Sequence, residues 1–165
     1  MWLYEWARKQ DIDFYSVDVE HRKREQDYSN INWVITESGS KWCKDILPGL
    51  NKTIKVLYLD NFDWIWKGMD NVGWIQDQVN LYKTYNMYMN NMNSQRAHLE
   101  QMMTALPSMA PQSIVVCDDT WYNKWWGHFS GKGGAVVPFL LNNGYEVLYT
   151  CEDPEYGTIL GRGIK

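Results

Sequence analysis

The sequence predicts an α/β protein: one domain with a mostly parallel sheet and an antiparallel hairpin at its C-terminal end. Apolar runs of strand length alternate with helical patterns over most of the chain, which favours parallel strands joined by helical crossovers. The last two apolar runs are separated only by a short turn, which favours a hairpin. A chain of 165 residues, 45% of them hydrophobic, is long enough to bury its own core, so we treat residues 1–165 as a single domain.

The N-terminal part of the chain alternates helices and strands. Residues 1–10 place two Trp, a Leu and an Ala on one helical face, so the chain begins within a helix. The next elements are expected as a strand over 12–19, a polar helix over 21–28, a strand over 31–36, a short helix over 41–47 and a strand over 54–59. Pro48 and Gly49 end the short helix. This order predicts parallel pairing of the three strands.

The C-terminal part continues the pattern and then departs from it. The expected elements are a helix capped by Ser94 that runs to Leu106, a turn over 107–112, a strand over 113–120, a Trp- and Gly-rich loop over 121–134, a helix over 135–142 and strands over 145–150 and 158–164. Leu99, Met102, Met103 and Leu106 form the expected buried stripe of the first of these helices. In the second helix Pro138 falls in the first turn, and Asn143-Gly144 gives a left-handed cap.

Residues 61–93 are rich in aromatic, Asn and Met residues. The segment follows the end of an expected strand and is expected to be partly helical from Trp74 onward. It is either a lid or substrate wall, or an aromatic surface used for packing and self-association, since aromatic and Met enrichment fits both.

Composition limits the classes of function. The net charge is -4 and the sequence has no basic tail, which argues against a dedicated nucleic-acid binder. No apolar run approaches the roughly 20 residues that cross a membrane, and the start of the chain lacks the pattern of a signal peptide. The 3 cysteines are widely spaced without a Cys-x-x-Cys, so we expect a reducing, cytoplasmic location.

Carboxylates follow three of the expected parallel strands: Asp18, Asp60, and the pair Asp118-Asp119. The C-terminal ends of parallel strands meet at one edge of a sheet, where ligands bind. An acid after an early strand can hold the hydroxyls of a ribose, and the later acids can converge on Mg²⁺ or Ca²⁺, which prefer oxygen ligands. The alternative is that these acids cap the loops and helices that follow them.

Two further residues are candidates for a catalytic role. His98 lies on the expected helix and could face the acids as a base, or lie on the helix surface. Lys132 lies in the Gly-rich loop and could neutralise an acid or bind a substrate carboxylate, or simply be solvated.

The order of elements resembles a class I S-adenosylmethionine-dependent methyltransferase with a Rossmann-like sheet. The local matches are Val56-Leu-Tyr-Leu-Asp60, the strand 113–120 with its two acids, and Gly131-Lys-Gly-Gly134 leading into residues 136–144. The arrangement is similar to metal-dependent O-methyltransferases that act on small molecules, and to their sugar-modifying relatives. The resemblance implies Asp60, Asp118 and Asp119 as metal ligands, Asp18 at the cofactor ribose, and Glu37, Ser38 and Gly39 beside its adenine.

The sequence departs from this family at its N-terminal end. The family's first strand and Gly-rich turn should precede the first helix, but no Gly-x-Gly lies upstream of Asp18. The resemblance therefore implies a truncated or split methyltransferase, completed by a partner chain or by homo-oligomerisation. The alternatives are a non-catalytic fold used in assembly, and a metal-dependent enzyme of nucleotide-sugar chemistry that uses the same acids.

Overall fold

The computed structural model of the chain describes residues 2–18, 31–36, 38–69, 72–152 and 157–164. Its elements in chain order are α1 (Trp2–Lys9), β1 (Phe14–Asp18), β2 (Ile31–Ile35), α2 (Gly39–Asp45), the 3-10 helix η1 (Leu47–Leu50), β3 (Ile54–Leu59), α3 (Gly73–Thr84), α4 (Asn91–Ala105), the 3-10 helix η2 (Leu106–Ser108), β4 (Met109–Cys117), β5 (Thr120–Asn123), β6 (His128–Gly131), α5 (Val136–Leu141), β7 (Glu146–Tyr149) and β8 (Thr158–Arg162). The predicted helix over 21–28 lies outside the described residues.

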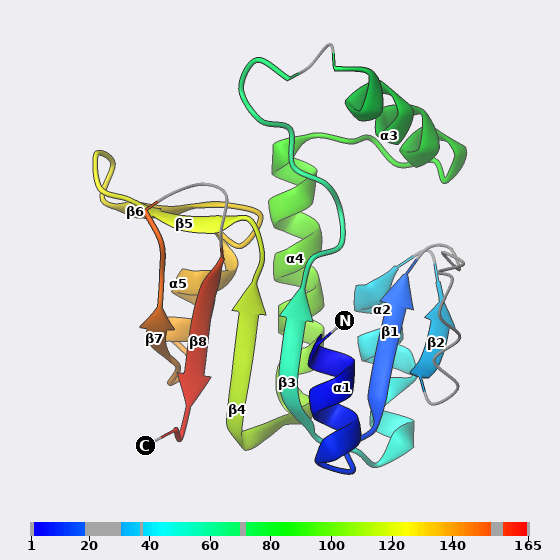
Figure 1. The fold of residues 1–165 in the computed structure, drawn as a ribbon, viewed down its shortest axis with the longest axis vertical. Coiled ribbons are helices and arrows are strands. Elements are labelled where there is room, and N and C mark those ends of the chain that lie inside the picture. Colours follow the sequence, from blue (N-terminus) through cyan, green and yellow to red (C-terminus); the bar gives the residue numbers. More distant parts are fainter. Residues whose placement is uncertain (1, 19–30, 37, 70–71, 153–156, 165) are drawn as a thin grey trace.

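The larger sheet has the strand order β3-β4-β8-β7 (Figure 1). Strand β4 runs parallel to β3, whereas β8 is antiparallel to both of its neighbours, β4 and β7. The last strand of the chain therefore lies inside the sheet and not at its edge. The predicted parallel pair and the predicted C-terminal hairpin are both confirmed.

Strands β1 and β2 form a separate parallel pair. Figure 1 shows β1 pointing the same way as β3, with α1 between them in this view. The Tyr4 ring of α1 meets the Phe14 ring of β1 edge to face, with centroids 5.9 Å apart. The parallel pairing was predicted, but the described part of the chain shows no ladder that joins β1 to β3 into one sheet.

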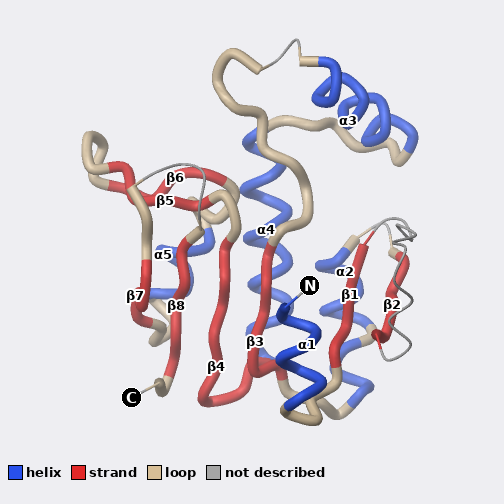
Figure 2. The backbone as a smooth tube through the Cα atoms, in the orientation of Figure 1, coloured by secondary structure: helices blue, strands red, loops and turns tan. Residues whose placement is uncertain are grey.

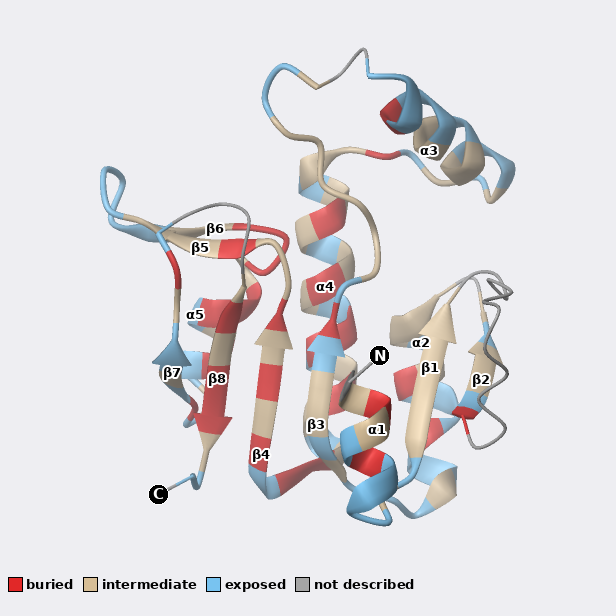
Figure 3. Ribbon diagram, viewed as in Figure 1, coloured by how far each residue is buried: buried red, intermediate tan, exposed pale blue. Residues whose placement is uncertain are grey.

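The core lies between one face of the larger sheet and the helices α4 and α5. A cross-strand row of Leu57, Val115, Leu160 and Val147 points into it, as the strand registers require. Figure 3 shows the resulting alternation of buried and partly exposed residues along β4. No helix in the described part of the chain is long and apolar enough to cross a membrane.

Several predicted elements differ in the structure. Strand β4 begins at Met109, within the predicted turn over 107–112, and ends at Cys117, before the predicted end at Thr120. The expected loop over 121–134 contains the antiparallel hairpin β5–β6, which lies across the C-terminal end of β4 (Figure 2). Its strands are only four residues long, with Gly127 in the turn between them and Gly131 at the end of β6, so the composition of the segment is that of a loop. Helix α4 begins at Asn91 because the Asn90 side chain caps it by accepting from the Asn93 N–H, so the predicted cap at Ser94 is wrong.

Candidate functional site

Three carboxylates meet at the C-terminal edge of β3 and β4. The strand register pairs Leu59 with Cys117, so the residues that follow them, Asp60 and Asp118, are neighbours. The Asp118 N–H donates to the Leu59 carbonyl at 3.1 Å and extends the ladder by one bond. Asp119 has φ 45°, in the left-handed region, and turns the chain from β4 into β5.

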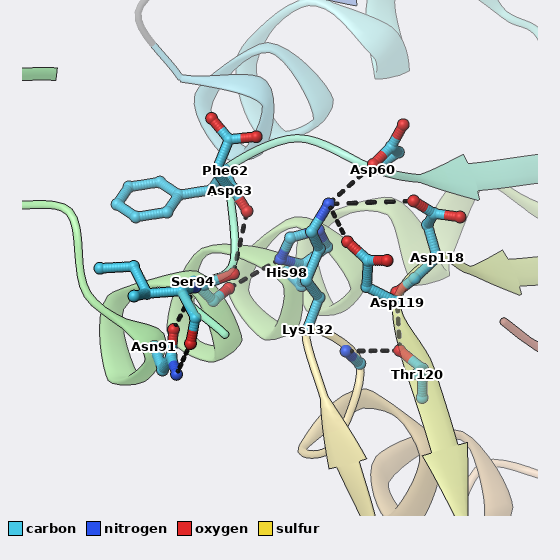
Figure 4. Close-up of polar contacts among 12 residues, drawn as sticks. Asp60, Phe62, Asp63, Asn91, Ser94, His98, Asp118, Asp119, Thr120 and Lys132 are labelled. Atoms are coloured by element: carbon cyan, nitrogen blue, oxygen red, sulfur yellow. Dashed lines mark hydrogen bonds and ion pairs between the residues drawn. The ribbon is translucent and has the colours of Figure 1, made fainter. Parts of the chain in front are cut away.

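Lys132 places its ammonium among these acids (Figure 4). Its Nζ lies 2.8 Å from Asp60 Oδ1, 2.9 Å from Asp119 Oδ2 and 3.9 Å from Asp118 Oδ2. The Lys132 side chain is only 5% exposed, whereas the three carboxylates keep partial access to solvent. The lysine is thus a buried cation that neutralises acids, and the alternative of a solvated loop lysine is wrong.

The β5–β6 hairpin holds Lys132 in this position. The Lys132 N–H donates to the Asp119 carbonyl at 3.0 Å, and the Gly133 N–H donates to Thr120 Oγ1 at 2.8 Å. Gly131 has φ 86°, and a Cβ atom there would lie 1.8 Å from the Asp119 carbonyl oxygen. Glycine at this position lets the hairpin return close to the acids.

The acids and the lysine shift each other's protonation. Burial, together with a hydrogen bond and the charge of Asp60, raises the pKa of Asp118 to about 7. Burial alone would lower the pKa of Lys132, but the charges and hydrogen bonds of Asp60 and Asp119 outweigh it and raise that pKa above its usual range. Near neutral pH, Lys132 is therefore charged, and Asp118 is present in both its protonated and its ionised form.

His98 lies on the buried face of α4, beside the Lys132 side chain in Figure 4. Its Nδ1 is 2.7 Å from the Ser94 carbonyl oxygen, which can only accept, so Nδ1 carries the proton and Nε2 a lone pair. Burial lowers the pKa of His98 to about 4. The imidazole is thus neutral near pH 7, and the alternative of a surface histidine is wrong.

Several buried acceptors near the acids have no hydrogen-bond partner among the described residues. They are Asn61 Oδ1, His98 Nε2 and Gln101 Oε1. Gly39 borders them: a Cβ atom there would lie 2.8 Å from Gln101 Nε2 and 3.5 Å from Asn61 Nδ2. Unpaired acceptors of this kind are costly unless water or a ligand donates to them. They fit a ligand that presents amino or hydroxyl groups.

An aromatic wall stands beside the acids. The Trp121 ring of β5 stacks on Trp66 at 5.4 Å between centroids, and meets Trp64 edge to face at 6.3 Å. The 61–93 segment that carries Trp64 and Trp66 is anchored to α4. The Asn91 side chain bonds both the N–H and the carbonyl of Ile65, at 2.7 and 2.8 Å. The Ser94 hydroxyl donates to the Phe62 carbonyl at 2.9 Å.

Asp18, Ser38 and Gly39 lie outside the acid cluster, at the end of β1 and at the start of α2. Asp18 ends β1, and its carbonyl accepts from the Thr36 N–H at 2.8 Å. The Ser38 side chain caps α2 by accepting from the Lys41 N–H, and Gly39 is the first residue of that helix. Glu37 lies outside the described residues.

Sequence reasoning missed the polar face of α4. The buried residues of this helix are Ser94, His98, Gln101, Met102 and Ala105, whereas Met103, which was predicted to be buried, is 52% exposed. The spacing of Ser94, His98 and Gln101 by four and three residues places them on one helical face, and this spacing could have indicated a polar buried face. The predicted stripe followed only the apolar residues of the helix and missed it.

The arrangement does not fit a divalent metal ion, because the Lys132 ammonium lies where Asp60, Asp118 and Asp119 converge. Over the described ranges, no group of three or more His, Cys, Asp or Glu residues is placed to hold a metal. Comparison with protein-family models, with curated proteins and with solved structures finds no match for this chain.

Proposed function

We propose that the chain is an S-adenosylmethionine-dependent methyltransferase-like protein that acts on an oxygen of a small molecule or sugar. The observation that carries this proposal is the strand order, with β8 antiparallel between β4 and β7 and the charged cluster at the C-terminal edge of the parallel strands β3 and β4. This is similar to the methyltransferase sheet with its terminal antiparallel hairpin. Ligands of open α/β sheets bind at that edge.

The edge beside β1 and α2 fits the nucleoside part of the cofactor. Asp18 at the end of β1 would take the ribose hydroxyls, and the start of α2 at Gly39 would border the adenine. The unpaired acceptors of Asn61 and Gln101 would receive donors from the base. We propose no residues for the methionine part, since no Gly-x-Gly precedes Asp18.

The acid cluster and the Trp wall would hold the acceptor. S-adenosylmethionine, when bound, supplies an electrophilic methyl group on a sulfonium. Asp118 would take the proton of the acceptor hydroxyl as the bond from oxygen to the methyl carbon forms and the bond from that carbon to sulfur breaks, which would leave a neutral thioether. The pKa of Asp118, about 7, suits proton transfer near neutral pH. The Lys132 ammonium would stabilise the developing oxyanion. The rings of Trp66 and Trp121 would orient the acceptor.

Calorimetric titration with S-adenosylhomocysteine tests this proposal. We expect saturable binding by the wild-type chain, weakened at least about tenfold in Asp18→Asn, because a carboxylate accepts stronger hydrogen bonds than an amide. Asp13→Asn is the matched control, since Asp13 is an exposed acid that pairs with Lys52 before β1. Absence of binding to the wild-type chain would remove the cofactor from the proposal.

A second candidate is a non-catalytic role in assembly, and the outer face of the larger sheet favours it. The registers place Tyr58, Val116, Ile159 and Tyr149 in one cross-strand row on the face opposite the core. Tyr58 and Tyr149 are 43% and 52% exposed. This row could receive a second copy of the chain or a partner chain, as could the edges of β1 and β3 that no ladder joins among the described residues.

Light scattering tests the assembly role. A self-associating chain would have the molar mass of a dimer or larger oligomer. Tyr149→Lys would shift that mass toward the monomer without loss of the folded signal in circular dichroism. A wild-type chain that is monomeric at high concentration would contradict self-association through this face. Retention of function in the variant with Asp118 and Asp119 both changed to Asn would instead argue against a catalytic role.

A further inference from the structure

We propose that Lys132 is the protein's own cation at the acid cluster, in place of a divalent metal ion, and that an uncharged residue at this position would turn the cluster into a Mg²⁺ or Ca²⁺ site. The inference deepens the proposed function and rests on it only for the role that the cation plays toward an acceptor. The placement of the charges is independent of that function.

The contacts of Lys132 are those of an ammonium that fills a cation position. Its Nζ is 2.8 Å from an Asp60 oxygen and 2.9 Å from an Asp119 oxygen, which are the lengths of charge-assisted hydrogen bonds. The Asp118 carboxylate faces the same nitrogen from 3.9 Å. A Mg²⁺ or Ca²⁺ ion would bind the same oxygens at about 2.0 to 2.6 Å. The charge of the ammonium, which occupies that position, would repel the ion.

The β5–β6 hairpin restricts movement of Lys132 away from the acids. Its backbone is fixed by the bond from its N–H to the Asp119 carbonyl and by the neighbouring bond from Gly133 to Thr120. Its side chain is almost fully buried, at 5% exposure. To admit a metal, the ammonium would have to leave two carboxylates and find other partners, so the metal competes with a charge that is already paired and held in place.

Removal of the ammonium would end this competition between the lysine and a metal ion. Asp60, Asp118 and Asp119 would then surround one position without the ammonium, and their oxygens, 2.8 to 3.9 Å from it, would move inward to bind a metal ion. Carboxylate oxygens that repel one another and keep partial solvent access are the ligand type that hard divalent cations bind, with water completing the coordination.

The test is a calorimetric titration of the wild-type chain, Lys132→Ala and Lys124→Ala with MgCl₂ and, separately, with CaCl₂. Lys124→Ala is the matched control, because it removes the same charge from an exposed pair with Glu152. We expect one metal ion per Lys132→Ala chain with a Kd on the order of 10⁻⁴ M, and binding at least about tenfold weaker in the wild type and in Lys124→Ala. A double variant, Lys132→Ala with Asp119→Asn, would lose the gained binding.

Two results would overturn the inference. One is stoichiometric metal binding by the wild-type chain that Asp119→Asn abolishes, because the metal would then displace the lysine. The other is a folded Lys132→Ala that binds neither ion. Should Lys132→Ala fold poorly, Lys132→Met keeps the volume of the side chain and serves the same titration, and the wild-type titration alone can still contradict the inference. None of these measurements uses S-adenosylhomocysteine, so they are separate from the test of the cofactor.

Discussion

Acidification should destabilise the protein through His98. The imidazole is fully buried at 0% exposure, and burial holds its folded pKa at about 4, against 6.5 for the free side chain. Between these two values the unfolded chain binds a proton that the folded chain does not bind. The stability due to neutral His98 is therefore complete above about pH 6.5 and is lost as the pH falls toward 4.

The size of the effect follows from the two pKa values. A gap of about 2.5 pKa units corresponds to about 3 kcal/mol over the whole window, of which about 2 kcal/mol is lost between pH 7 and pH 5. Asp118 acts in the opposite direction, because its folded pKa is raised to about 7 and the folded chain takes up that proton first. The pH dependence of the wild type alone therefore mixes two contributions of opposite sign.

A comparison with His98→Asn isolates the histidine. The Asn amide can still donate to the Ser94 carbonyl, but it does not titrate. We would measure the free energy of unfolding in urea, by circular dichroism, at pH 7 and pH 5. The difference between wild type and variant should shift by about 2 kcal/mol against the wild type at pH 5. An unchanged difference would refute the reasoning, and His128→Asn, at an exposed histidine, is the control.

Two packing predictions follow from the structure and use the same unfolding measurement at pH 7. Gly133→Ala should destabilise the chain by about 1 to 3 kcal/mol, since the added Cβ would lie 2.6 Å from Thr120 Oγ1, whereas Gly73→Ala, with open space around it, should be neutral or stabilising. Leu160→Ala should cost about 2 to 5 kcal/mol because the side chain is 0% exposed, and Leu148→Ala, 46% exposed, about 1 kcal/mol or less. Equal effects within either pair would contradict the packing described.

The larger sheet could be predicted from the sequence because its central strand is buried on the core face along its length. Val115 and Cys117 are 0% exposed, and such β-branched, apolar runs occur in strands covered by helices. The β5–β6 hairpin could not be predicted in the same way. Its pairing of Thr120 with Gly131 depends on a close approach that only the folded backbone defines, and the local composition is that of a loop.

The same limit explains why the acids could be predicted together, whereas Lys132 as their cation remained one of several alternatives. Asp60, Asp118 and Asp119 each follow a strand, and parallel strands end at one edge, so topology brings the three together. Lys132 reaches them only because the hairpin folds back over that edge, and nothing in the residues around it indicates burial. The metal was inferred from the oxygen ligands, because the sequence does not show that Lys132 lies among them.

The Lys132 ammonium also makes the three acids differ in charge pairing and in pKa. Lys132 donates to Asp60 and Asp119 at hydrogen-bond distance but stands 3.9 Å from Asp118, so two carboxylates are paired closely and the third is not. The third acid, Asp118, is partly buried and interacts with Asp60, and its pKa rises to about 7. A divalent ion bound by all three would hold all of them ionised and leave none to exchange a proton. A lysine at this position therefore gives the edge of the sheet both a fixed positive charge and a proton acceptor.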